Sequence, residues 1–230
     1  MCFSATASFS VGASLTLLGS LTIRTASASV NARKQLPFAA IPLLFGVQQL
    51  VEGSLWLSLE HQFAWLQTLT TYLFTFFSHI LWPAFVPFAV AMLEKGGTGA
   101  IPPWRWRMLW ALRITGIVVA FMLAGLVATE PLTAVAGSHI VYVTPFFYDW
   151  PMMVLYIAAT CLSALISSQR MVRLFGALVF VFFFVSYWFY TEAFFSVWCF
   201  FAAILSAVIY LHVRAVGRGS SSANKNIREG

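Results

Sequence analysis

Long apolar stretches, almost free of charged residues, are the feature that most constrains what this chain can fold into. Seven of them can be read, at 4–23, 36–57, 66–93, 108–128, 150–168, 171–190 and 193–213. A helix needs roughly 20 apolar residues to cross the hydrocarbon core of a bilayer. Because only 9% of all residues are charged, a water-soluble fold of this size could not cover its surface. The sequence therefore predicts an all-α integral membrane bundle of seven transmembrane helices, surrounded by the lipid bilayer.

The boundary between the last two stretches needs a separate argument, because they run together from Met171 to Val213 with Glu192 as the only acid. A single helix of that length would be about 65 Å long, roughly twice the hydrocarbon thickness. Arg170 and Arg214 flank it and favour the same side of the membrane. Both observations favour a helical hairpin that turns near residues 190–192.

The loops fix the expected orientation. All thirteen basic residues lie in or beside the first, third and fifth loops or in the tail. The second, fourth and sixth loops contain no Lys or Arg and carry Glu60, Glu130, Asp149 and Glu192. Since basic loops stay in the cytoplasm, we expect a multi-pass protein of the cytoplasmic (inner) membrane with its N-terminus outside and its C-terminus inside. The net charge of +6 is explained by this asymmetry, and no basic patch for nucleic acid is present.

One membrane domain is expected over residues 1–216. No Lys or Arg precedes Arg24, so the first stretch lacks the basic start of a secretory signal and is expected to remain as a helix. Residues 217–230 are polar and rich in Ser, and are expected to form a disordered cytoplasmic tail. The fourth loop, from Thr129 to Asp149, is the longest and is expected to form part of a site or a lid over it.

Polar residues within the apolar stretches indicate where a site lies, because an ionisable side chain costs about 2.5–3.5 kcal/mol at mid-membrane. Glu52 lies near the outer end of the second stretch and shares a helix face with Gln48. His79 lies near the middle of the third, and Glu192 at the turn of the last hairpin. We expect Gln48, Glu52, His79 and Glu192 to line an outward-facing polar pocket that binds a small molecule or an ion.

Other interpretations of these residues remain open. Glu52 and His79 could simply hydrogen-bond neighbouring helices, as polar side chains in membrane bundles do, and the chain would then be a structural subunit of a complex. Cys2, Glu52 and His79 are candidate ligands for a transition metal such as zinc, although their spacing matches no recognised motif. A metal held there would activate water, as in a membrane-embedded hydrolase.

The opening Met1-Cys2-Phe3-Ser4-Ala5-Thr6-Ala7-Ser8-Phe9 resembles the start of a family of uncharacterised bacterial membrane proteins that begin with MCFSATAS. The segments IPLLFGVQQLVEG (41–53), FSHILWP (77–83) and SVWCFFAAILS (196–206) also resemble that family. The resemblance implies a bacterial membrane protein and carries no catalytic role. It directs attention to the segments that contain Cys2, Glu52, His79 and Cys199.

Overall fold

The computed structural model describes residues 4–29, 31–97, 101–143 and 150–215. Most of these residues are helical. The α-helices are α1 (Ala5–Ser27), α2 (Ala32–Ala39), α3 (Ile41–Glu60), α4 (Ala64–Thr75), α5 (Trp82–Lys95), α6 (Pro103–Thr129), α7 (Trp150–Ile157), α8 (Ser163–Leu165), α9 (Arg170–Phe189) and α10 (Phe194–Leu205). Two π-helical segments, η1 (Phe76–Leu81) and η2 (Ala158–Leu162), and one 3-10 turn, η3 (Thr191–Ala193), connect some of them.

Six helical stretches are long and apolar enough to cross a membrane: Ala5–Ser27, Ala32–Glu60, Ala64–Glu94, Pro103–Thr129, Arg170–Phe189 and Thr191–Ala215. They correspond to six of the seven predicted stretches, and the helical class is confirmed. The remaining stretch, 150–168, forms a shorter apolar helix, Trp150–Leu165. The helical hairpin predicted near Glu192 is also present, because α9 and α10 are joined by η3. The predicted tail, 217–230, lies outside the described residues.

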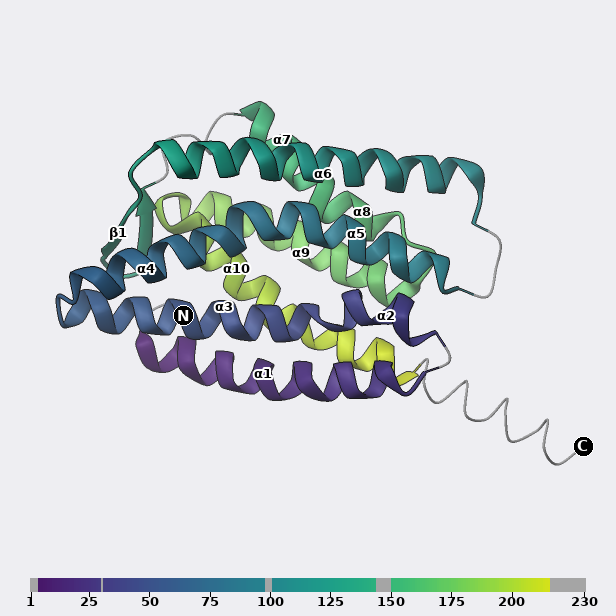
Figure 1. Cartoon of the computed structure of the whole chain (residues 1–230), viewed down its shortest axis with the longest axis horizontal. Coiled ribbons are helices and arrows are strands. Elements are labelled where there is room, and N and C mark those ends of the chain that lie inside the picture. Colours follow the sequence, from purple (N-terminus) through teal and green to yellow (C-terminus); the bar gives the residue numbers. More distant parts are fainter. Residues whose placement is uncertain (1–3, 30, 98–100, 144–149, 216–230) are drawn as a thin grey trace, which may run out of the picture.

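The helices run back and forth along one long axis, so that their connections gather at two opposite ends (Figure 1). At one end, the connections after α1, α5 and α8 are tied together. Asn31 Nδ2 donates to the Gly96 carbonyl at 3.0 Å, and Ser167 Oγ donates to Glu94 Oε1 at 2.6 Å. Arg33 and Arg170 belong to this end, which we call the basic end.

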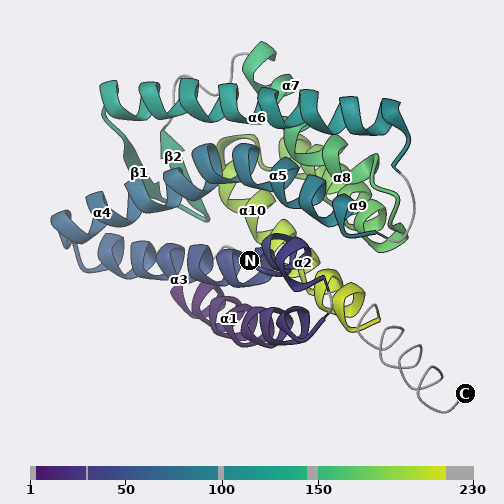
Figure 2. The same ribbon diagram turned by 45° about the vertical axis from the view of Figure 1, so that its right-hand side comes forward.

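The opposite end, which we call the hairpin end, contains a β-hairpin within the predicted fourth loop. Thr133–Ala136 and Ile140–Val143 form the antiparallel strands β1 and β2, with Thr133 opposite Val143. Gln67 Nε2 at the start of α4 donates to the Ala134 carbonyl at 3.2 Å and holds this hairpin on the bundle. Figure 2 shows the strands at the same end of the molecule as the turn between α3 and α4.

Glycines allow some helices to approach each other closely, as is common where no hydrophobic effect drives helices together. α1 lies along α3 (Figures 1 and 2). A Cβ at Gly19 of α1 would lie 2.3 Å from the Leu43 backbone nitrogen, closer than atoms can approach. Gly116 of α6 is equally tight, since its Cβ would lie 1.9 Å from the Pro83 carbonyl oxygen. These contacts fix how α1 packs on α3 and how α6 packs on α5.

We therefore expect Gly116→Ala to lower the free energy of unfolding by about 1–3 kcal/mol, because the added methyl group overpacks the contact between α6 and α5. The matched control is Gly125→Ala in the same helix, where an added Cβ meets nothing within 4 Å. That control should be neutral or slightly stabilising, since Ala is the better helix former. Unfolding of both variants in mild detergent is the measurement, and equal stability of the two would contradict the close contact.

Candidate functional site

A buried carboxyl group is the centre of the candidate site. Glu52 of α3 is 0% exposed. Its Oε1 accepts a 2.6 Å hydrogen bond from Ser196 Oγ in the first turn of α10, and its Oε2 accepts a 3.2 Å bond from Gln49 Nε2. The bond to Ser196 joins two helices that are 144 residues apart in sequence. Glu52 is therefore held between α3 and α10, facing the interior of the bundle.

A second hydrogen bond joins α3 to α5. Trp82 Nε1 donates to Gln48 Oε1 at 2.8 Å, and both side chains are buried. Because an indole N–H can only donate, this bond fixes which way round the Gln48 amide lies. Gln48, Gln49, Glu52, Trp82 and Ser196 are called the Glu52 cluster below. It links three of the helices that form the core.

The Glu52 cluster retains hydrogen-bonding capacity that the described residues do not use. Gln48 Nε2 and Gln49 Oε1 are buried and have no hydrogen-bond partner within the described parts of the chain. The Cys199 thiol interacts with the Gln48 side chain, but sulfur is only a weak acceptor, and this contact does not satisfy the amide nitrogen. Each buried polar group left in this way costs about 1–3 kcal/mol. One donor and one acceptor on α3 are thus available.

His79 lies close to the Glu52 cluster. Its side chain is 1% exposed, and its Nδ1 is 2.7 Å from Ser78 Oγ. Its ring packs on Phe195 with a centroid separation of 4.2 Å. Phe195 and Ser196 are neighbours in the first turn of α10. His79 of η1 contacts Phe195, and Glu52 of α3 bonds to Ser196, so both side chains contact the same turn of α10.

The backbone around His79 departs from an α-helix for an identifiable reason. In η1 the Trp82 N–H donates to the Phe77 carbonyl, five residues earlier. The next donor in this pattern would be residue 83, which is a proline and has no N–H. The Ser78 carbonyl is therefore left for another donor, and the Tyr156 hydroxyl of α7 provides it. π-helical turns of this kind are frequent at functional sites.

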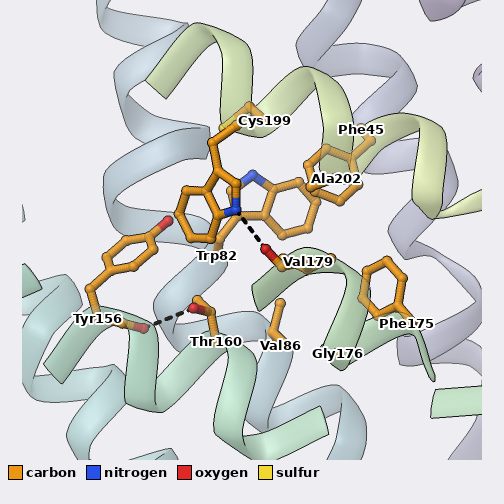
Figure 3. A pocket seen from close by; sticks show the side chains of 11 residues that line it. Phe45, Trp82, Val86, Tyr156, Thr160, Phe175, Gly176, Val179, Cys199 and Ala202 are labelled. Atoms are coloured by element: carbon orange, nitrogen blue, oxygen red, sulfur yellow. Dashed lines mark hydrogen bonds between the residues drawn. The ribbon is translucent and has the colours of Figure 1, made fainter. Parts of the chain in front are cut away.

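A small cavity lies one to two turns along α10 from the Glu52 cluster. Its volume is about 40 Å³, and it is enclosed by α3, α5, α7, α9 and α10. Figure 3 shows the side chains of Phe45, Trp82, Tyr156 and Cys199 around it. Trp82 belongs both to this lining and to the Glu52 cluster. The cluster and the cavity are therefore neighbouring parts of one interior region.

Glu192 is separated from that region. It is exposed, and it lines an open hollow of about 550 Å³ at the hairpin end together with His139 and Tyr190. The rings of His139 and Tyr190 lie 5.1 Å apart. Partial burial lowers the pKa of the His139 imidazole below its ordinary value, which favours the neutral ring. Gln48, Glu52 and His79 thus lie in one part of the interior, whereas Glu192 lies at the hollow.

The metal-binding alternative receives no added support from the geometry. Among the side chains that the structure describes, no group of three or more His, Cys, Asp and Glu could hold a metal ion. Cys2, the third member of the predicted set with Glu52 and His79, lies outside the described residues. The zinc hypothesis therefore stays a prediction from the sequence.

Sequence reasoning missed several residues that shape the interior. Ser196 and Tyr156 carry common side chains, and only the packing of α10 and α7 makes them partners of α3 and η1. Glu94 was also missed. It is buried at the basic end, where its Oε1 accepts from Ser167 Oγ and from the Ser168 N–H at 3.0 Å. The signal for Glu94 was available, because an acid beside basic Lys95 is unusual at a basic end.

We expect Ser196→Ala to lower the free energy of unfolding by about 1–3 kcal/mol, because the buried Glu52 carboxyl group loses a short interhelical bond. Ser54→Ala is the matched control: Ser54 bonds the Leu50 carbonyl of its own helix and joins no second helix. That control should change stability by less than about 0.5 kcal/mol. Denaturant unfolding in detergent measures both variants, and an unchanged stability of Ser196→Ala would contradict the proposed bond between α3 and α10.

Comparison with known proteins identifies the family to which the chain belongs. No curated protein and no solved structure matches the chain. The sequence model of one family matches residues 1–225 and therefore covers nearly all of the chain. This chain belongs to that family, which is described as a family of unknown function (DUF6629).

Proposed function

We propose that this chain is a multi-pass membrane protein that binds a small molecule or an ion, as a sensor or a transporter, at the Glu52 cluster. One observation carries the proposal. A buried carboxyl group lies beside a donor, Gln48 Nε2, and an acceptor, Gln49 Oε1, that have no partner within the described residues. Ionisable groups inside a bilayer are expensive, and they mark functional sites such as substrate and ion pathways.

The unused donor and acceptor separate this proposal from a purely structural role. Polar residues that only join helices are stabilising when their hydrogen bonds are complete, and a half-satisfied network is worse than an apolar core. The hydrogen bonds from Ser196 and Trp82 already join α10 and α5 to α3. Gln48 Nε2 and Gln49 Oε1 add a penalty without adding contacts. A ligand that meets both groups would remove that penalty.

The route to the site follows one face of α10. Ala193 borders the hollow at the hairpin end, Ser196 holds Glu52, and Cys199 lines the cavity. Residues three and four apart lie on the same face of a helix. In this proposal a ligand enters from the hollow, passes the Glu52 cluster and reaches the cavity. The outward-facing pocket expected from the sequence then becomes a buried site beneath the hollow.

The membrane topology is part of the proposal. Trp150–Leu165, although shorter than the six membrane-length helices, begins beside the middle part of α6 and extends toward the basic end. Counting it gives seven crossings, with the N-terminus outside and the C-terminus in the cytoplasm, as the distribution of basic residues favours. We place the protein in the cytoplasmic membrane of a bacterium. The hairpin end, with the hollow, then faces outward.

Reporter fusions test the topology. Green fluorescent protein inserted at Ser168 should fluoresce, and alkaline phosphatase inserted at Gly137 should be active, because these positions flank the short crossing on its cytoplasmic and outer sides. Exchanging the two reporters should abolish both signals. If both positions favour the same reporter, Trp150–Leu165 does not cross the membrane and the seven-helix topology is wrong.

The ligand-binding proposal predicts that protein purified in lipid nanodiscs from its native host carries a small molecule or ion near one equivalent. Native mass spectrometry detects the former and elemental analysis the latter. Glu52→Gln keeps the size of the side chain and one acceptor oxygen for Ser196, but removes its charge and the second acceptor oxygen. We expect this variant to lose at least about 90% of the bound species, which for a nearly saturated site requires about a hundredfold loss of affinity, or about 2.8 kcal/mol.

Two comparisons make this result interpretable. Ser54→Ala, on the same helix and away from the Glu52 cluster, should retain the bound species. Zinc, copper or iron lost on His79→Ala would favour the metalloprotein alternative. A protein that carries nothing, and whose Glu52→Gln variant only unfolds more easily, would contradict ligand binding and favour a structural subunit.

A further inference from the structure

The cavity beside the Glu52 cluster has a distinctive lining. Aromatic rings from five helices border it: Phe45, Trp82, Tyr156, Phe175 and Trp198. Phe45 and Trp82 are stacked with their centroids 4.0 Å apart, so that each ring covers one face of the other and leaves its outer face, and the rings of Tyr156 and Trp198 lie 5.8 Å apart and tilted. The faces of such rings are negative, and several faces around one space attract a cation. The cavity thus resembles an aromatic cage.

Hydrogen bonds within the lining leave little else to recognise a ligand. The Trp198 indole donates to the Val179 carbonyl at 3.1 Å, and the Thr160 hydroxyl donates to the Tyr156 carbonyl at 2.9 Å (Figure 3). The Trp82 indole is engaged by Gln48. A neutral polar ligand would find these donors occupied. Recognition is therefore left to the ring faces and to charge.

The charge near the cavity has one sign. The lining contains no Lys, Arg or His. Ser196, which holds the Glu52 carboxyl group, and Cys199, which is part of the lining, lie three residues apart on one face of α10. The carboxyl group therefore lies about one helical turn from the cavity, where it can act as a counter-ion for a cation held by the rings. An anion, in contrast, would face both the carboxylate and the ring faces.

We infer that the cavity binds the ammonium head of a small organic cation, with the aromatic rings as the cage and Glu52 as the counter-ion. This inference rests on the proposed function and names the class of its ligand. The volume of about 40 Å³ compares with roughly 10–15 Å³ for one water molecule measured in the same way. The cavity is therefore suited to a compact head and excludes a bulky or long group.

Equilibrium binding to the full chain in nanodiscs of neutral lipid tests this, with choline as the probe and 3,3-dimethylbutan-1-ol as its uncharged counterpart of the same shape. We expect saturable binding of choline that is about tenfold tighter than binding of the alcohol, the size of a desolvated cation–π effect. Trp82→Leu should weaken choline binding by at least about tenfold, because it removes the face with the strongest attraction for a cation.

Trp188→Leu is the matched control, because Trp188 is 80% exposed on α9 and does not line the cavity. It should leave choline binding unchanged. Trp82→Phe keeps a ring at the same place and should bind choline more tightly than Trp82→Leu, which separates loss of the cage from loss of folding. Glu52→Gln should weaken binding of choline and leave that of the alcohol unchanged.

Equal affinity for choline and the alcohol would overturn the inference while leaving small-molecule binding intact. Absence of saturable choline binding would also overturn it, and the proposed function would then stand only if the native protein carries another species that Glu52→Gln releases. Choline binding that is insensitive to Trp82→Leu would place the cation elsewhere and equally overturn the cage.

Discussion

The hydrogen bond between Ser196 and Glu52 is the interaction on which the arrangement of the interior depends. In a bilayer no water reaches the middle of a bundle, so a buried carboxyl group must find its partners within the protein. At 2.6 Å, this bond sets how far α10 can slide or rotate against α3. The same contact brings Phe195 onto His79 and Cys199 beside Gln48. A shift of one residue along α10 would remove all three contacts together.

The π-helical turn η1 provides the second constraint. Pro83 cannot donate to the Ser78 carbonyl, and Tyr156 of α7 donates instead. The proline at position 83 thereby accounts for a contact between η1 and α7, which are distant in sequence. It also aligns Tyr156 and Trp82, so that both rings border the cavity. The cage, the polar cluster and the π-helical turn are thus parts of one arrangement rather than separate features.

The parts of the fold and of the site that the sequence predicted are those that depend on local sequence properties. Apolar length is a local property, and it located all six membrane-length helices and the shorter one. The cost of a buried charge is also local, and it identified Glu52 and His79. In contrast, Ser196 and Tyr156 are distinguished only by what lies opposite them, which no local pattern records. The β-hairpin was missed because its strands, four residues each, are too short to be distinguished from a polar loop.

The central claim is that Gln48 Nε2 and Gln49 Oε1 are kept for a ligand rather than for the fold. A high-resolution density map of the protein in native lipids tests this most directly. We predict density that belongs to no residue of the chain within hydrogen-bond distance of both amide groups, next to Trp82 and Cys199. A map in which both amides contact only atoms of the chain itself would contradict the account and make the Glu52 cluster a structural joint between helices.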